Sequence, residues 1–449
     1  MRIVFDNIED CFNGKKDWKG NRTCASPYFI HLSVQKNFST PILKPEMMPA
    51  GTKPNNILFT LNDAYRIEHY SSRDADITGF NYIYPIGVHG APEHWMNVNE
   101  ESIFSGIDNK HLDKARKGEA LLVIDNSLEG YHDANLFSFF NRECSSRSIP
   151  VENVVFITGN LNVHELKEDY ERENNLKTIT VIGYSHFEYD IYEESVKTEI
   201  VAPTWEEQFK YKTENLENIK TFNFLNRRPR DHRIWMYTTL HKHNLLKDSI
   251  VSMNKFTVGM DSPRRMGIET LSTKDQMEAA ATLPVFYDDV PTYGTDESIP
   301  GTVFINRLNE QPMLDSWITV VSEAQFEDAD KAAFLSEKVF KPIACSSPFI
   351  ILGAKNSLKL LRDKHGYQTF DALIPEGYDT LNDVDRVNYI TEHLKHFSSI
   401  SNKEKLEWFK HMRGVIEYNK MIFEYNSRLK PPVFFHYFME FCKSTITLN

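Results

Sequence analysis

Residues 121–158 read LLVIDNSLEGYHDANLFSFFNRECSSRSIPVENVVFIT, and this stretch decides the fold class. Its first four and last five residues are short apolar runs bounded by turn residues, which predicts two strands. Residues 132–144, between them, predict a helix. Two strands joined through a helix cannot form a tight hairpin, so the stretch predicts a βαβ unit and a parallel sheet.

The same alternation of apolar runs and helix-compatible stretches continues on both sides of this unit. Further strands are expected at residues 3–5, 57–60, 83–86, 178–182, 221–225, 317–321 and 349–352. Helices are expected at residues 231–243, 332–343, 356–364 and 402–425, where Pro431-Pro432 closes the last of them. The sequence therefore predicts an α/β protein.

A chain of 449 residues is too long for one hydrophobic core, so two domains are expected. The acidic stretch at 204–218 is poor in aliphatic residues and suits a linker or a bridging helix. We expect an N-terminal domain over residues 1–215 and a C-terminal domain over 216–425. Residues 426–449 are expected to form a tail that packs back on the N-terminal domain.

Composition excludes several classes of protein. The formal charge of −12 does not suit a protein that coats nucleic acid through a general basic surface, although a local basic cleft remains compatible with it. No run of eighteen apolar residues occurs, so no membrane partner is expected. Five cysteines at unrelated spacings favour a reducing cytoplasm over a disulfide framework or a cysteine zinc site.

Three enzyme motifs are missing from the sequence. Neither G-x-x-x-x-G-K-[ST] nor G-x-G-x-x-G occurs, which disfavours a P-loop enzyme and a Rossmann oxidoreductase. The 16 histidines include no H-E-x-x-H, which disfavours a zinc hydrolase. The chemistry must therefore come from other residue clusters.

The densest basic cluster follows the predicted strand at 221–225. It reads N-R-R-P-R-D-H-R over residues 226–233, between that strand and a helix start. Free N–H groups at a helix start and arginine forks both suit an anion such as phosphate. The residues concerned are Asn226, Arg227, Arg228, Arg230 and Arg233. The alternative is a solvated basic turn paired with surface carboxylates.

A second cluster reads S-E-K-V-F-K over residues 336–341. Lys338 and Lys341 are three apart and share a helix face, while Glu337 points roughly one hundred degrees from Lys338. One carboxylate beside two ammonium groups suits a nucleoside diphosphate, because the carboxylate accepts from ribose hydroxyls and the lysines neutralise phosphates. Glu323 follows the strand at 317–321, at the sheet edge where ligands bind. The alternative is a surface helix with ordinary charge pairs.

Together these residues resemble the donor half of GT-B nucleotide-sugar glycosyltransferases, in particular the fucosyltransferase-like group. Glu323 matches the Glu that ends a strand in that pattern, and Ser336, Glu337 and Lys338 match its [S/T]-E-K triplet, before S-P-F-I-I-L-G at 347–353. The segment is more similar still to glycosyltransferase-like proteins of large phages, which share the L-N-R-R-P-R-x-H-R run. The similarity is good over residues 220–390 and weak before them.

The resemblance implies two Rossmann-like domains with parallel sheets facing a central cleft. It implies a UDP- or GDP-linked nucleotide-sugar bound by the C-terminal domain, an acceptor bound by the N-terminal domain, and no metal or other cofactor. The donor-binding residues would be Asn226, Arg227, Arg228, Arg230, Arg233, Glu323, Ser336, Glu337, Lys338 and Lys341. Sugar transfer also needs a base for the acceptor hydroxyl.

Our candidates for this base follow strand ends in the N-terminal half. Asp125 and Glu129 lie in the I-D-x-x-x-E-G piece, one of two N-terminal pieces that look similar to phage proteins; I-T-G-N at 157–160 is the other. His89, with Glu93, lies in G-V-H-G-A-P-E. An aspartate after a strand is as often a turn former as a base.

Two acceptors fit the phage resemblance: a hydroxymethylated pyrimidine in double-stranded phage DNA, or a surface or protein glycan. We favour DNA, because phage enzymes of this type mask the genome. Two basic clusters could follow phosphates, namely Lys15 and Lys16 with Trp18, and Lys114, Arg116 and Lys117. The alternative is that both are solvated loops. A different class of function is a non-catalytic module that only docks a partner.

Overall fold

A computed structural model describes residues 2–5, 68–71, 77–88, 96, 103–127, 129–130, 135–226, 230–253, 308–326, 333–372 and 375–446. The chain forms two compact units. Unit 1 comprises Met1–Tyr189, Lys331–Phe334 and Ser427–Asn449, and unit 2 comprises Asp190–Asp330 and Leu335–Asn426. The first change of unit falls at residue 190, upstream of the boundary expected at 215.

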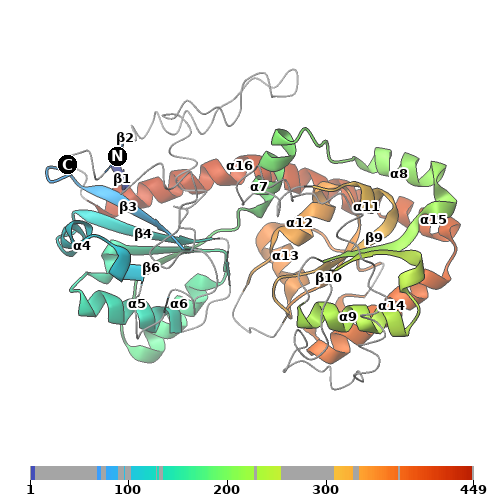
Figure 1. Cartoon of the computed structure of the whole chain (residues 1–449), viewed down its shortest axis with the longest axis horizontal. Helices are drawn as coiled ribbons and strands as arrows, with labels where there is room; N and C mark the ends of the chain where they lie inside the picture. Colours follow the sequence, from blue (N-terminus) through green and yellow to red (C-terminus); the bar gives the residue numbers. More distant parts are fainter. Residues whose placement is uncertain are drawn as a thin grey trace. The chain divides into compact units, whose positions relative to one another are not determined.

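Unit 1 is built on a parallel sheet whose described strands follow the order β2-β1-β3-β4-β5-β6 (Figure 1). Their bounds are β1 Arg2–Phe5, β2 Glu68–Ser71, β3 Tyr82–Gly87, β4 Ala120–Asn126, β5 Val154–Thr158 and β6 Thr180–Gly183. All of the paired strands run parallel. The predicted βαβ unit is confirmed, with α5 (Asn135–Ser146) joining β4 to β5.

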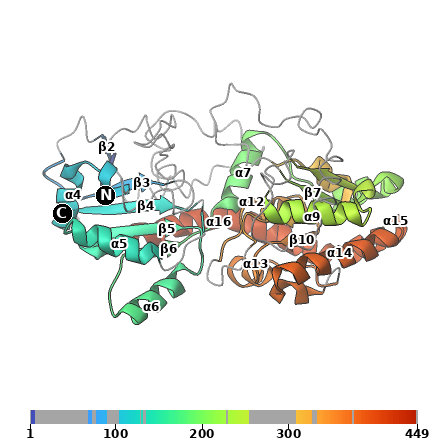
Figure 2. The same ribbon diagram turned by 60° about the horizontal axis from the view of Figure 1, so that its bottom comes forward.

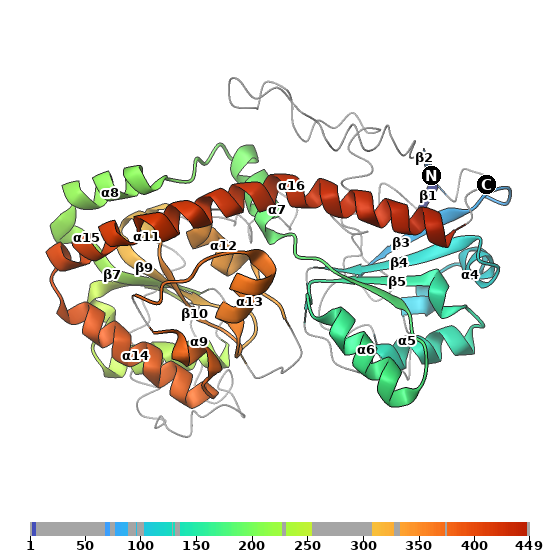
Figure 3. The same ribbon diagram turned by 180° about the vertical axis from the view of Figure 1, so that it is seen from behind.

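Both faces of this sheet are covered, because alternate residues of each strand belong to different cores. Leu122, Ile124 and Phe156 pack with residues of α4 (Asn109–Arg116), α5 and α6 (Val163–Asn174). Leu121 and Val155 pack instead with the end of α16 (Arg413–Thr445), seen on that face in Figure 3. This two-sided burial explains why the strands read as continuous apolar runs.

Unit 2 carries a second parallel sheet, whose described strands follow the order β10-β9-β7-β8. Their bounds are β7 Lys220–Leu225, β8 Ser249–Ser252, β9 Ser316–Ser322 and β10 Phe349–Leu352. The helices are α8 Trp205–Glu214, α9 Asp231–Lys242, α11 Gln311–Leu314, α12 Glu337–Ala344, α13 Ser357–His365, α14 Asp383–Ser399 and α15 Asn402–His411. Helices α9 and α14 lie side by side (Figure 2). The prediction of an α/β protein with two parallel-sheet domains is confirmed.

Two predicted helix bounds are wrong. The helix expected at 332–343 begins only at Glu337, because Ser336 has extended backbone dihedrals and occupies the N-cap. Helix α16 does not stop before Pro431-Pro432 but continues to Thr445. Proline removes helical hydrogen bonds, yet the buried Phe435, Phe438 and Met439 beyond it pack in a core of unit 1 and stabilise the continuation.

Three further points concern a predicted strand, the helices that both units share, and membrane-spanning segments. The strand expected at 57–60 lies outside the described residues. Helix α7 (Phe187–Lys197) and helix α16 each contribute residues to both units. No described helix is long and apolar enough to cross a membrane.

Candidate functional site

Three neighbouring strands of unit 2 end at one edge of the sheet. Because the strands are parallel, their carboxyl ends meet, and Asn226, Glu323 and Gly353 follow β7, β9 and β10 directly. Open parallel sheets bind ligands at this edge. The structure therefore brings the two clusters singled out in the sequence to the same edge of one unit.

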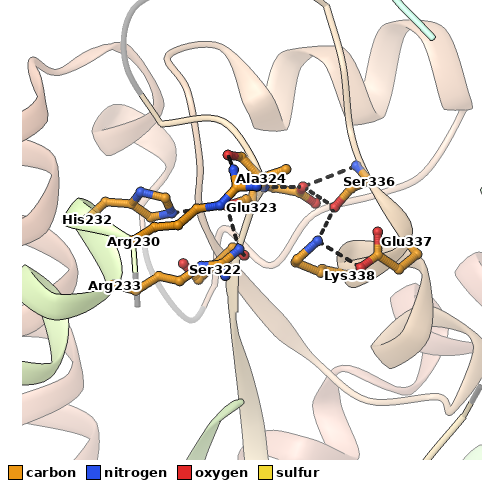
Figure 4. Close-up of polar contacts among 9 residues, drawn as sticks. All are labelled: Arg230, His232, Arg233, Ser322, Glu323, Ala324, Ser336, Glu337 and Lys338. Atoms are coloured by element: carbon orange, nitrogen blue, oxygen red, sulfur yellow. Dashed lines mark hydrogen bonds and ion pairs between the residues drawn. The ribbon is translucent and has the colours of Figure 1, made fainter. Parts of the chain in front are cut away.

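Glu323 is the centre of the hydrogen-bond network at this edge (Figure 4). Its Oε2 accepts from the backbone N–H of Ala324 and of Ser336, both at 3.1 Å, and from the Ser336 hydroxyl at 2.6 Å. The side chain is 2% exposed. Three donors on one oxygen fix the carboxylate and also fix the residue that begins α12.

The other carboxylate oxygen of Glu323 has no hydrogen-bond partner among the described residues. Burial raises the pKa of this carboxyl above its ordinary value, against the opposing effect of the Lys338 ammonium and the Ser336 hydrogen bonds. A buried polar oxygen without a partner is costly unless a ligand or water supplies one. Oε1 is therefore an acceptor available to a bound hydroxyl or N–H group.

Lys338 joins the triplet S-E-K into one polar cluster. Its Nζ donates to the Ser336 hydroxyl at 3.0 Å and to Glu337 Oε1 at 2.8 Å. Burial alone would raise the pKa of Glu337, but the Lys338 and Lys341 ammonium groups outweigh burial and hold this pKa below its usual range. Glu337 is thus ionised at neutral pH. Lys341 is half-buried, and burial lowers its pKa.

The start of α9 lies against the end of β9. The guanidinium of Arg230 donates to the Ala324 carbonyl, and that of Arg233 donates to the carbonyls of Ser322 and Glu323 at 3.4 and 3.3 Å. Arg233 is buried, at 4% exposed. These contacts hold the backbone that carries Glu323, and a phosphate contact of Arg233 stays a prediction. Asn226 is buried beside Ser252, whereas Arg227 and Arg228 lie outside the described residues.

Two supporting residues were not foreseen in the sequence. Nε2 of His232 donates to the Glu323 carbonyl oxygen at 3.0 Å, and burial lowers the pKa of His232 to about 3, so the ring is neutral. The buried guanidinium of Arg386 donates to the Gly353 and Leu381 carbonyls, both at 2.7 Å. His232 was visible in the R-P-R-D-H-R run, but no local pattern marks Arg386.

Both of these residues also contact the ring of Phe326, which follows β9. The His232 imidazole stacks on it at 5.1 Å, and the Arg386 guanidinium lies 5.2 Å from its centroid. Stacking of a guanidinium on an aromatic ring is favourable when both are desolvated. Through these contacts His232 and Arg386 connect four parts of unit 2. They are the loops after β9 and β10 and the helices α9 and α14.

Gly353 is in close contact with the site. A methyl group at this position would lie 2.8 Å from Ser357 Oγ, 3.1 Å from Ile351 and 3.3 Å from the Cβ of Glu323. The absence of a side chain at the end of β10 is therefore required by packing. Packing thus explains why a glycine stands at the end of the S-P-F-I-I-L-G segment.

The candidate bases belong to unit 1, at the carboxyl edge of its sheet. Oδ1 of Asp125 accepts from the Ser127 N–H at 2.8 Å, as in a turn former. The Glu129 carbonyl accepts from Gly159 N–H at 2.9 Å and from the Thr158 hydroxyl at 3.1 Å. Both residues thus lie near the ends of β4 and β5. His89 and Glu93 lie outside the described residues.

A further titratable group at this edge was missed in the sequence. His186 and Glu188 follow β6 and are each 1% exposed. Burial lowers the pKa of His186 to about 3, and Glu188 lies 3.7 Å from the ammonium of Lys430. The signal that could have found them is S-H-F-E, a histidine and a carboxylate directly after a strand and a glycine.

The basic clusters expected to bind an acceptor are partly described. Lys114 donates to the Thr78 carbonyl at 2.8 Å and pairs with Glu119 at 2.7 Å, and Arg116 donates to the Arg147 carbonyl at 2.7 Å. The side chains of Lys114 and Arg116 therefore already have partners within unit 1, whereas Lys117 is exposed. Lys15, Lys16 and Trp18 lie outside the described residues.

The chain was compared with known proteins. No protein-family model and no curated protein matches it. A UDP-forming α,α-trehalose-phosphate synthase from Burkholderia vietnamiensis is similar in structure with a TM-score of 0.37 and 10% identity, over 74% of this chain and 69% of that one. The N-terminal domain of a Candida albicans trehalose-6-phosphate phosphatase gives a TM-score of 0.35 and 9% identity, over 93% of this chain and 82% of that one. Both TM-scores lie below 0.5, so the proposals below rest on the site's own contacts.

Proposed function

We propose that the protein is a nucleotide-sugar-dependent glycosyltransferase of the GT-B kind that binds its donor at the carboxyl edge of the unit 2 sheet. One observation carries the proposal. Two buried carboxylates, Glu323 and Glu337, lie with the Lys338 ammonium at the start of a helix, and one oxygen of Glu323 has no hydrogen-bond partner within the described part of the chain. Carboxylate acceptors beside a cation suit a ligand that carries both hydroxyl groups and phosphates.

In this proposal each residue has a defined task. Glu323 Oε1 or the Glu337 carboxylate accepts from ribose hydroxyls. An ammonium group has three donors, and Lys338 uses two of them on Ser336 and Glu337. The third would bind a diphosphate oxygen, with Lys341 adding positive charge. These contacts strengthen as negative charge develops on the leaving nucleoside diphosphate, which is how they would accelerate transfer.

Arg227, Arg228 and Arg230 complete the proposed diphosphate site. Arg230 is exposed at the N-cap of α9, and its guanidinium already donates to the Ala324 carbonyl beside Glu323. Guanidinium forks suit phosphate oxygens. The proposed base for the acceptor hydroxyl is Asp125, Glu129 or His89.

For the acceptor we propose a 5-hydroxymethylated pyrimidine in phage DNA. Lys114 and Arg116 already form an ion pair and a hydrogen bond within unit 1, so they do not support a DNA acceptor. The contacts to DNA phosphates would have to come from Lys117 and from Lys15, Lys16 and Trp18. A surface or protein glycan is the competing acceptor.

Thermal-shift measurements with UDP-, GDP- and CMP-sugars test the proposal. Stabilisation by one nucleotide class is expected, because a ligand that binds only the folded state raises the melting temperature. Absence of a shift with all three would leave the partner-docking module as the better account. Release of free nucleotide only when hydroxymethylated DNA is added would establish the DNA acceptor, and release with unmodified DNA or glycans would contradict it.

A further inference from the structure

Phe334 occupies a slot in unit 1 whose walls come from distant parts of the sequence. A methyl group at Gly130 would overlap the side chain of Phe334, and one at Gly159 would lie 2.7 Å from its Cε2. The ring also makes an edge contact with Phe187 at 5.8 Å between centroids. The ring therefore fits only because Gly130 and Gly159 have no side chains.

The backbone next to this ring is anchored as well. The Ala333 N–H donates to Asn160 Oδ1 at 3.0 Å, and the Ala333 carbonyl accepts from the Leu161 N–H at 2.9 Å. Asn160 is itself fixed, since its N–H donates to the Thr158 hydroxyl at 3.1 Å. A ring in a slot and two paired hydrogen bonds hold Ala333 and Phe334 to unit 1.

The chain leaves unit 1 directly after Phe334. Leu335 is buried in unit 2, and Ser336 makes the two hydrogen bonds to Glu323 Oε2 that fix the start of α12. Two residues of extended chain span at most about 7 Å. Only Leu335 therefore separates the residue anchored in unit 1 from Ser336, the first residue of the cluster.

We propose that Phe334, together with the glycine slot that receives it, is a positioning device for the carboxylate and lysine cluster of unit 2. Phe334 needs no contact with the ligand for this role. Loss of the ring frees the residues before Ser336, so the hydrogen bonds to Glu323 break more often and the cluster loses its fixed geometry. Gly130 and Gly159 serve the same purpose from the other side.

Amide hydrogen exchange in the full-length chain tests this inference without any ligand. Phe334→Ala should raise exchange at Ser336, whose N–H is held by Glu323, by at least about tenfold, because removal of a partly buried, packed ring weakens local structure. Gly130→Ala should do the same by expelling the ring. Phe334→Leu, which refills part of the slot, should restore most of the protection and guards against failure of the alanine variant to fold.

A matched control and a second readout complete the design. Gly79→Ala adds a methyl group in unit 1 where no atom of a described residue lies within 4 Å, so it should leave the exchange at Ser336 unchanged. The affinity for UDP and GDP should fall in Phe334→Ala and recover in Phe334→Leu. Unchanged exchange at Ser336 in both Phe334→Ala and Gly130→Ala would overturn the inference. Wild-type protein that binds no nucleotide would instead overturn the proposed function, while the exchange result would stand.

Discussion

The Ser336 hydroxyl donates a 2.6 Å hydrogen bond to Oε2 of Glu323, across thirteen residues of chain. This bond joins the end of β9 to the start of α12 and places the S-E-K triplet beside the carboxylate that ends the strand. Ser336 also accepts from Lys338, so one hydroxyl connects the acidic and basic members of the site.

Ser336→Ala should weaken nucleotide binding while leaving the protein folded. Hydrogen bonds to charged groups contribute about 1.5–3 kcal/mol, so we expect a decrease in affinity of roughly ten- to hundredfold. Titration calorimetry with the stabilising nucleotide measures it. Ser399→Ala removes an exposed hydroxyl that donates to the His396 carbonyl, and this variant should bind the nucleotide normally. Equal affinity in both variants would contradict the role given to Ser336.

Lys338→Ala should depress sugar transfer strongly. Loss of the ammonium removes the positive charge proposed to bind the diphosphate, and the Glu337 carboxyl loses the nearest group that lowers its pKa. Transfer rates should fall by about a hundredfold or more, as when one charge-stabilising donor is removed from an active site. Lys359→Ala, an exposed lysine of the same unit, is the control. Near-normal transfer by Lys338→Ala would remove the donor site from this edge.

Gly353→Ala should disturb the site without changing any charge. The added methyl group would lie 2.8 Å from Ser357 Oγ and 3.3 Å from the Glu323 Cβ, so Glu323 or the start of α13 must shift. Overpacking of this kind costs about 1–3 kcal/mol. Denaturant unfolding measures this cost, and nucleotide affinity should fall with it. Gly377→Ala, which adds a methyl group in open space in unit 2, should do neither.

The buried histidines predict a loss of stability in acid. Burial lowers the pKa of both His186 and His232 to about 3, against about 6.5 for an exposed imidazole. Between these values the unfolded chain binds more protons, so stability is fully present above pH 6.5 and is lost as the pH falls towards 3. Each histidine contributes a slope of up to about 1.4 kcal/mol per pH unit.

Urea unfolding followed between pH 4 and 6.5 checks this slope. His232→Gln keeps an N–H for the Glu323 carbonyl but does not titrate. The variant should therefore lose the contribution of one histidine to the dependence of the unfolding free energy on pH. Glu323 works in the opposite direction, because burial raises its pKa and favours the neutral carboxyl in the folded state. Equal slopes in the wild type and in His232→Gln would show that the His232 imidazole keeps its ordinary pKa and would contradict the prediction.

The parallel sheets could be predicted because their strands are buried on both faces. Strands β5 and β10 coincide with the residues expected, and β7 and β9 extend beyond the expected runs by one or two residues. Strand β8 and helix α14 were not expected, since short strands and ordinary amphipathic helices carry weak local signals. The course of α16 through Pro431 depends on aromatic packing far from it in sequence.

The site was predictable in its residue types and not in its contacts. Glu323, Ser336, Glu337 and Lys338 could be selected because a strand end and a helix start each have a local pattern. That Arg233 and His232 support the β9 backbone depends on burial that no local pattern shows. The slot for Phe334 depends on glycines about 200 residues earlier in the chain, which only the folded unit brings together.

The buried guanidinium of Arg386 has a practical consequence for anyone dissecting the protein. It binds the Gly353 carbonyl, and a few residues before it the Asp379 carboxylate accepts from the first N–H groups of α13. An expression fragment that ended soon after Gly366 would keep every residue proposed to touch a nucleotide. The fragment would nevertheless lack Arg386 and Asp379, which hold the end of β10 and the start of α13. We therefore expect it to be inactive and sensitive to proteases.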